Sequence, residues 1–137
     1  MMNPALKRAQ LNREAILSAS PARLLTMLYD RLLVDLNRAE TAQLAKDWAM
    51  ASENLVHAQA IISELISSLD IEAWSGAKGL HGIYAFATEL LIDANVKHDA
   101  ARTRQAISLM EPLRQTWHEA ASAPGTPIAG DGGVRIG

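Results

Sequence analysis

The sequence contains no cysteine, which excludes disulfides and thiolate-held metal sites and fits a reducing compartment. No apolar run approaches the ~20 residues of a membrane-spanning helix, and the first ten residues lack the apolar stretch of a signal peptide. The net charge is −2, so no basic surplus is available for a phosphate backbone. We therefore expect a cytoplasmic protein that neither crosses a membrane nor binds nucleic acid.

Aromatic residues are also scarce, with one Phe, two Tyr and three Trp among 137 residues. The apolar fraction of 49% is nevertheless ordinary for a folded chain, so the core must be aliphatic. Leu, Ala, Glu, Gln and Arg dominate residues 21–120 and β-branched runs are few, which favours helix over strand. The length suits one domain with a real core.

The clearest helix start in the chain is at Ser20-Pro21. Serine is a strong N-cap residue, and proline is favoured at the first helical position. Apolar residues then recur at helical spacing and predict a helix over residues 21–45. The stripe consists of Leu24, Leu25, Leu28, Leu32, Leu36 and Ala39.

Three more amphipathic helices follow. Asp47 is placed to cap a helix over residues 48–69, and a third helix begins near Ala77 or Leu80 and ends at Asn95, which tolerates a left-handed C-terminal conformation. Asp99 is placed to cap a fourth helix over residues 100–120, in which Pro112 predicts a kink without ending the helix.

Helices of this length with mostly short connections predict an all-α fold, an antiparallel four-helix bundle over residues 20–121. Residues 1–19 form a short N-terminal leader that either docks on the bundle or stays mobile. Residues 122–137 are rich in glycine and proline without periodicity, and predict a disordered C-terminal tail.

Residues with catalytic or metal-binding potential are sparse. The four histidines form no Glu-x-x-His motif of the kind that holds metal in a bundle. Glu53 and His57 stand four residues apart, which suits either a single-ion site or, more simply, an exposed polar pair. Gly76-Ala77-Lys78-Gly79 lacks the length and strand context of a phosphate-binding loop and is interpreted as a connection. We expect no enzyme activity, no metal and no cofactor.

Several apolar residues lie away from the main stripes. They are Met27 and Val34 in the first helix and Phe86, Ile92 and Val96 in the third. Two interpretations stay open at this point: a patch that receives a partner helix, or a wide core stripe in a tightly packed bundle.

The chain resembles the FliS family of flagellar secretion chaperones through an ordered series of motifs between about residues 11 and 120. The series runs Ser18-Ala19-Ser20-Pro21, Leu24-Leu25, Met27-Leu28-Tyr29-Asp30, residues 57–65 (HAQAIISEL), Ser67-Ser68-Leu69-Asp70, Ala77-Lys78-Gly79-Leu80, Ile83-Tyr84-Ala85-Phe86, residues 94–99 (ANVKHD) and Leu113-Arg114-Gln115-Thr116-Trp117. Leu11 stands where the family usually has an aromatic residue, and Arg31 where it usually has glycine.

The resemblance implies a cytoplasmic chaperone with a four-helix core. It would bind the disordered C-terminal segment of flagellin, prevent premature polymerisation and deliver the subunit to the flagellar type III export apparatus. We expect a monomer or weak homodimer whose apolar groove is partly covered by residues 11–17. The expected partner-binding residues are Leu11, Ile16, Met27, Tyr29, Val34, Ile83, Tyr84 and Phe86.

Other functions remain compatible with the same residues. A self-associating four-helix module without a client would bury Met27, Val34 and Phe86 against a second copy. A metal- or ligand-binding bundle enzyme is a third hypothesis. For Tyr29 and Tyr84, a simpler alternative is a position at the bundle edge with each hydroxyl in water.

Overall fold

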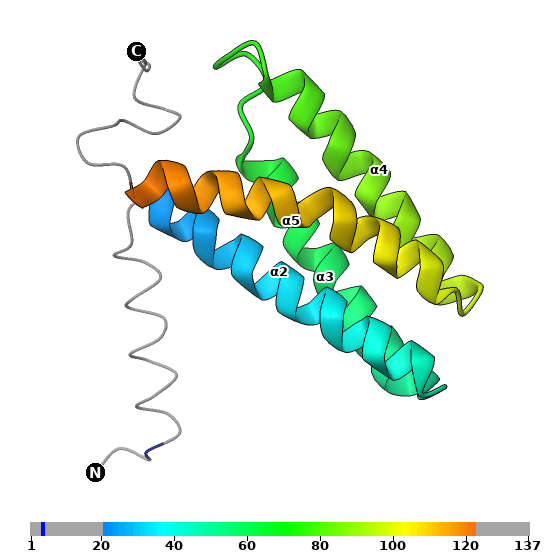
Figure 1. The fold of residues 1–137 in the computed structure, drawn as a ribbon. Helices are drawn as coiled ribbons and strands as arrows, with labels where there is room; N and C mark the ends of the chain where they lie inside the picture. The colour runs from blue at the N-terminus through cyan, green and yellow to red at the C-terminus, as the bar shows by residue number, and fades with distance from the viewer. Residues whose placement is uncertain (1–3, 5–20, 123–137) are drawn as a thin grey trace.

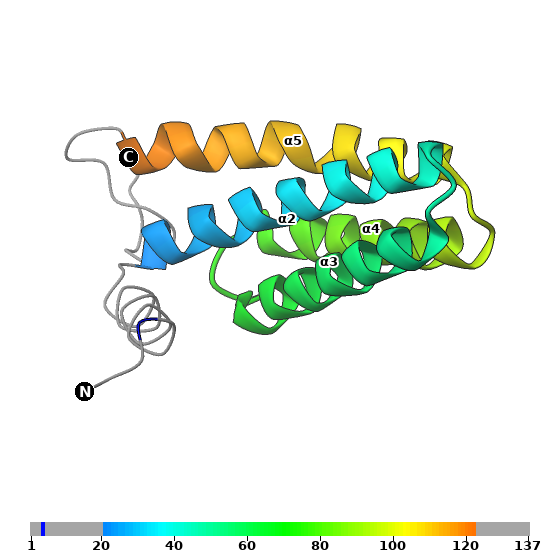
Figure 2. The same ribbon diagram turned by 90° about the horizontal axis from the view of Figure 1, so that it is seen from below.

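The computed structural model describes Pro4 and residues 21–122. This part of the chain forms helices α2 (Pro21–Leu44), α3 (Trp48–Ser68), α4 (Ala77–Val96) and α5 (Ala100–Ser122). Helix α2 packs against α3 and α5, and α4 packs against the same two helices from the other side (Figures 1 and 2). The predicted all-α antiparallel four-helix bundle is therefore confirmed.

The helix starts follow the capping chemistry of the sequence. Helix α2 begins at Pro21, and the Asp47 carboxylate accepts a hydrogen bond of 3.2 Å from the Met50 N–H at the start of α3. The Asp99 carboxylate accepts one of 2.9 Å from the Ala101 N–H in the first turn of α5. Both aspartates satisfy backbone donors that a free helix end would leave unpaired.

The ends of α2 and α4 share one backbone geometry. Lys46 and His98 each adopt a left-handed conformation, with φ of 60° and 53°. In each case the next N–H, of Asp47 or Asp99, bonds back to a carbonyl five residues earlier, which is a Schellman ending. The prediction that Asn95 ends its helix in this conformation is wrong, because α4 continues to Val96.

The core lies between all four helices and is aliphatic. Its fully buried side chains include Leu32 and Leu36 from α2, Leu55 and Ile62 from α3, Leu91 from α4 and Met110 from α5. Burial of this apolar area is the main stabilising contribution to such a bundle. The predicted stripe of α2 supplies the core through Leu32, Leu36 and Ala39, while Leu25 and Leu28 pack against it half-buried.

Helix α5 continues through Pro112 to Ser122, as one unbroken ribbon in Figure 2. The proline carbonyl accepts a hydrogen bond of 2.9 Å from the Thr116 hydroxyl one turn later. Pro112 is exposed, so its ring faces away from the core. The predicted continuation past the proline is confirmed.

The connection between α3 and α4 is the longest in the described part of the chain. Trp74 folds over Gly76, and a Cβ at Gly76 would lie 2.0 Å from a ring carbon of that tryptophan. A side chain at this position would therefore have to displace the Trp74 ring. Helix α4 starts immediately afterwards at Ala77, which confirms the earlier of the two predicted starts. Gly79 is therefore helical, and the interpretation of residues 76–79 as a connection holds only for Gly76.

The leader, the Ser20 cap, Leu11, Ile16 and the tail beyond Ser122 lie outside the described residues. Within the described residues, none of the helices combines the length and the apolar character that crossing a membrane requires.

Candidate partner-binding surface

Helices α3 and α4 leave several large apolar side chains in solvent. Ile92 is 48% exposed, Val96 is 75% exposed and Val56 is 56% exposed. Phe86, the one phenylalanine of the chain, is 52% exposed. Single exposed apolar residues are ordinary, but neighbouring ones mark an interaction surface.

A hydrogen bond between α3 and α4 shows which of these residues are neighbours. The Asn95 side chain donates to the Ser52 hydroxyl at 3.2 Å. The helices are antiparallel, so one turn onward along α3 to Val56 matches one turn backward along α4 to Ile92. Val56, Ile92 and Val96 therefore share one face, which we call the α3–α4 surface.

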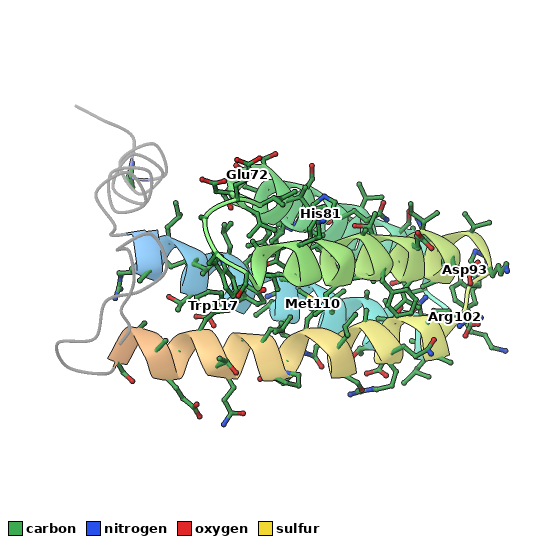
Figure 3. The ribbon with its side chains drawn as sticks, turned by 90° about the horizontal axis from the view of Figure 1, so that it is seen from above. Glu72, His81, Asp93, Arg102, Met110 and Trp117 are labelled. Atoms are coloured by element: carbon green, nitrogen blue, oxygen red, sulfur yellow. The ribbon has the colours of Figure 1, made fainter. Side chains whose placement is uncertain are left out.

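An ion pair fixes the register on the other side of α4. The Asp93 carboxylate lies 3.1 Å from the Arg102 guanidinium at the turn between α4 and α5, and Figure 3 shows the two side chains together. Phe86 precedes Asp93 by two turns and Leu109 follows Arg102 by two turns, so these apolar residues face the same side. Together with half-buried Ile83 they form the α4–α5 surface.

The two predicted partner-binding residues of α2 have a different setting. Val34 is 40% exposed and Met27 is half-buried. They are seven residues apart and so lie on one outward stripe of α2, away from the exposed residues of α4. The structure thus brings Ile83 and Phe86 to one surface and leaves Met27 and Val34 on another.

Tyr29 and Tyr84 do not belong to either surface. Both are fully buried, and their hydroxyl oxygens are 2.6 Å apart in a hydrogen bond that joins α2 to α4 across the core. The ring centroids are 6.5 Å apart. Burial raises the pKa of both phenols, and the Tyr29 hydrogen bond raises that of Tyr84 further. The alternative of hydroxyls in water is wrong, because each hydroxyl finds its partner inside the core. The expectation that both tyrosines line a partner-binding groove stays a prediction.

A buried carboxylate in α2 escaped the sequence analysis. Asp35 is fully buried, accepts a hydrogen bond of 3.1 Å from the Arg31 Nε and is bonded to the His57 Nδ1 of α3. His57 therefore pairs across helices instead of with Glu53. The sequence signal that could have predicted this buried carboxylate is the position of a charged residue between the core residues Leu32 and Leu36.

A second buried polar contact ties three helices together. The Gln43 side chain of α2 donates to the Ala94 carbonyl at 3.2 Å and accepts from the Thr103 hydroxyl at 2.7 Å. Both Gln43 and Thr103 are buried, so these bonds satisfy polar groups that would otherwise be costly. The contact fixes the end of the bundle where α4 turns into α5.

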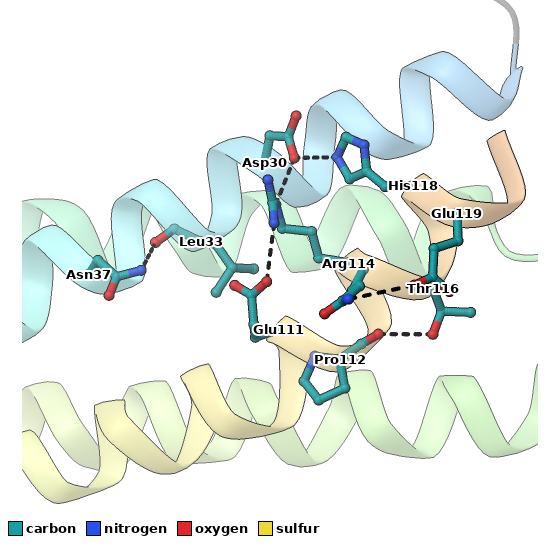
Figure 4. Close-up of polar contacts among 10 residues, drawn as sticks. Asp30, Leu33, Asn37, Glu111, Pro112, Arg114, Thr116, His118 and Glu119 are labelled. Carbon is teal, nitrogen blue, oxygen red and sulfur yellow. Dashed lines mark hydrogen bonds and ion pairs between the residues drawn. The ribbon is translucent and has the colours of Figure 1, made fainter. Parts of the chain in front are cut away.

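The side of the bundle between α2 and α5 is bridged by charged residues. Asp30 accepts from Arg114 at 2.8 Å and pairs with His118 at 2.6 Å, while Arg114 also reaches Glu111 at 3.1 Å (Figure 4). Further along, the Arg104 guanidinium holds the Glu40 carboxylate with its Nε at 2.8 Å. We call this row of ion pairs the α2–α5 seam.

Within residues 21–122, no group of three or more His, Asp or Glu side chains is arranged to hold a metal ion.

Comparison with known proteins agrees with this geometry. The family model described as "Flagellar protein FliS" matches residues 2–124. The chain is 32% identical over 101 residues to the flagellar secretion chaperone FliS of Campylobacter jejuni, covering 73% of this chain and 79% of that protein. It is 30% identical over 119 residues to the Escherichia coli protein of the same name, covering 85% and 88%.

The Bacillus subtilis flagellar secretion chaperone FliS is 27% identical over 122 residues, covering 89% of this chain and 91% of that protein. The family model and these relatives match the all-α bundle along nearly its whole length, so the protein is of the flagellar secretion chaperone class. The chain belongs to the FliS family.

Proposed function

We propose that this chain binds the disordered C-terminal segment of flagellin in the cytoplasm, prevents its premature polymerisation and delivers it to the flagellar export apparatus. Membership of the FliS family supports a flagellar client. The observation that carries the proposal is the pair of exposed apolar surfaces on α4, on a bundle whose core is already filled by its own side chains.

The physical basis is coupled folding and binding. A disordered segment loses conformational entropy when it orders, so it needs apolar area on a preformed partner to offset that cost. The α3–α4 surface and the α4–α5 surface offer such area on both sides of one helix. An amphipathic segment wrapping around α4 would cover Ile92 on one side and Phe86 on the other. No chemical step is involved, and the chain acts as a binding protein without enzyme activity.

The test is isothermal titration of the full chain with a peptide from the C-terminal end of flagellin of the same organism. We expect saturable binding with a strongly negative heat-capacity change, because apolar area is buried. A scrambled peptide of the same composition is the control. Absence of binding to the native peptide, with the bundle folded, would contradict the proposal. Sedimentation across a concentration series would then show whether the apolar surfaces of α4 pair with a second copy.

A further inference from the structure

A hollow of about 470 Å³ lies where the end of α2 meets the start of α3. It is lined by Asn37, Arg38, Thr41, Ala42, Ala45, Asp47, Met50 and Asn54, and we call it the α2–α3 pocket. This volume is within the range of sites that accept a small ligand or a large side chain. Its mouth includes the exposed residues Thr41, Ala45 and Met50, so an incoming group reaches it from solvent.

Most polar side chains around the α2–α3 pocket are already engaged locally. Asn37 donates to the Leu33 carbonyl at 2.7 Å, and Asn54 donates to the Met50 carbonyl at 2.9 Å. The Asp47 carboxylate caps α3. Arg38 differs, because its guanidinium forms no hydrogen bond or ion pair with any residue in the described part of the chain.

This lack of a partner distinguishes Arg38 from other arginines of the bundle. Four of them each hold a carboxylate: Arg31 with Asp35, Arg102 with Asp93, Arg104 with Glu40 and Arg114 with Asp30. A planar guanidinium recognises a carboxylate through two parallel hydrogen bonds. An unpaired guanidinium beside apolar walls therefore complements a ligand that combines an apolar group with a carboxylate.

We propose that the α2–α3 pocket docks a peptide segment of a partner protein that inserts an aliphatic side chain and places a neighbouring Asp or Glu carboxylate on Arg38. The side chains of Ala42, Ala45 and Met50 receive the aliphatic group, and the flexible thioether adapts to its shape. Val34 lies one turn before Arg38 on the exposed side of α2, so a segment continuing along α2 meets a second apolar contact. This site is separate from the α4 surfaces and does not rest on flagellin binding.

The test uses two capped dipeptides, acetyl-Leu-Glu-amide and acetyl-Leu-Gln-amide, added to the full ¹⁵N-labelled chain. They share size and shape but only the first carries a carboxylate. We expect saturable shifts of the Thr41, Ala45 and Met50 amide signals, with the Glu dipeptide binding about threefold more tightly, as for an exposed ion pair.

Two variants assign the site. Arg38→Gln should abolish the difference between the dipeptides. The control Lys78→Gln removes the same charge in the first turn of α4, at the opposite end of the bundle and about 30 Å away along the length of α3, and should keep the difference. Thr41→Phe changes an exposed residue, fills the α2–α3 pocket and should abolish the shifts for both dipeptides.

Three results would overturn the proposal. They are no saturable shift at these amides, equal affinity for both dipeptides, and the same amides shifting with protein concentration alone, which would mean that a second copy occupies the pocket. Neither dipeptide derives from flagellin, so failure here and failure of client binding are distinguishable.

Discussion

The α2–α5 seam and the two sides of α4 show different ways of closing a four-helix bundle. Along the seam, Glu40 pairs with Arg104 and Asp30 pairs with Arg114 and His118, so charges cover the line where the helices meet. Along α4, Phe86 and Ile92 stay in solvent. Ion pairs specify one neighbour through geometry and charge, whereas exposed apolar groups accept any segment with a matching apolar face.

This difference indicates how one small bundle can be both stable and receptive. Exposed ion pairs contribute little energy, so the seam adds orientation more than stability. The stability comes from the shared core, in which the Tyr29–Tyr84 hydrogen bond connects α2 to α4. The exposed side chains of α4 are then available for a partner without loss of the fold.

The largest expected effect is on the affinity for flagellin, and it distinguishes the two sides of α4 from the α2–α5 seam. Ile92→Glu and Phe86→Glu, made singly, should each weaken binding of the C-terminal flagellin peptide at least tenfold, because each buries a charge against an apolar partner. Isothermal titration measures the affinity. Ser108→Glu, at an exposed position of α5, is the matched control and should leave it unchanged.

These variants should fold as the parent does, with free energies of unfolding within about 0.5 kcal/mol, since both positions are half exposed. If only Phe86→Glu weakens binding, the α3–α4 surface is not used. If neither does, α4 is not the client-binding helix.

A second effect concerns the core that both regions share. Tyr29→Phe should lower the free energy of unfolding by about 1.5 kcal/mol, because it leaves the buried Tyr84 hydroxyl without a partner. The double variant with Tyr84→Phe should cost less than the sum of the two single variants, since neither hydroxyl then remains unpaired. Denaturant unfolding measures all three. Strict additivity would show that the hydroxyls do not pair in solution.

A smaller effect is expected at the seam. Arg114→Gln should lower the free energy of unfolding by about 0.5 kcal/mol, and the difference should shrink as salt screens the pairs with Asp30 and Glu111. Affinity for the flagellin peptide should not change. A tenfold loss of affinity in this variant would show that the seam itself binds the client.

The smallest effect is the pH response of the α4–α5 turn. A hydrogen bond from Lys97, aided by Arg102, lowers the pKa of Asp93 below its ordinary value. A carboxyl with a lower pKa in the folded state stabilises the fold above its unfolded pKa and loses that contribution as pH falls through the folded pKa, here below about pH 4. Asp93→Asn should therefore reduce the loss of stability between pH 7 and pH 3. An unchanged acid response would mean that these cations do not act on Asp93 in solution.

The four helices and most of their ends follow from local sequence signals. The spacing of Leu32, Leu36 and Ala39 specifies which side of α2 is buried, and Asp47 and Asp99 cap helices as expected. Local signals failed at Asn95, because His98 carries the left-handed conformation three residues later. Lys46 and His98 show that a Schellman ending does not require glycine or asparagine.

The candidate site depends on contacts between helices. These contacts join residues that are far apart in the sequence, so local sequence patterns do not predict them. The exposure of Phe86 and Val34 was predictable from their distance to the main stripes. The pairing of Tyr29 with Tyr84, and of Asp35 with His57, depends on how far one helix is shifted along another. That shift results from packing of the whole core, so periodicity alone does not show which buried side chains meet.

The most direct test of client binding on α4 is methyl NMR of the full chain with and without the C-terminal flagellin peptide. Ile92, Val56 and Val96 report on the α3–α4 surface and Leu109 on the α4–α5 surface, while Val34 reports on α2 within the same sample. We predict large, saturable shifts for the reporters of both α4 surfaces. Shifts confined to Val34 and Met27, with Ile92 and Leu109 unchanged, would contradict the account and assign the client to α2.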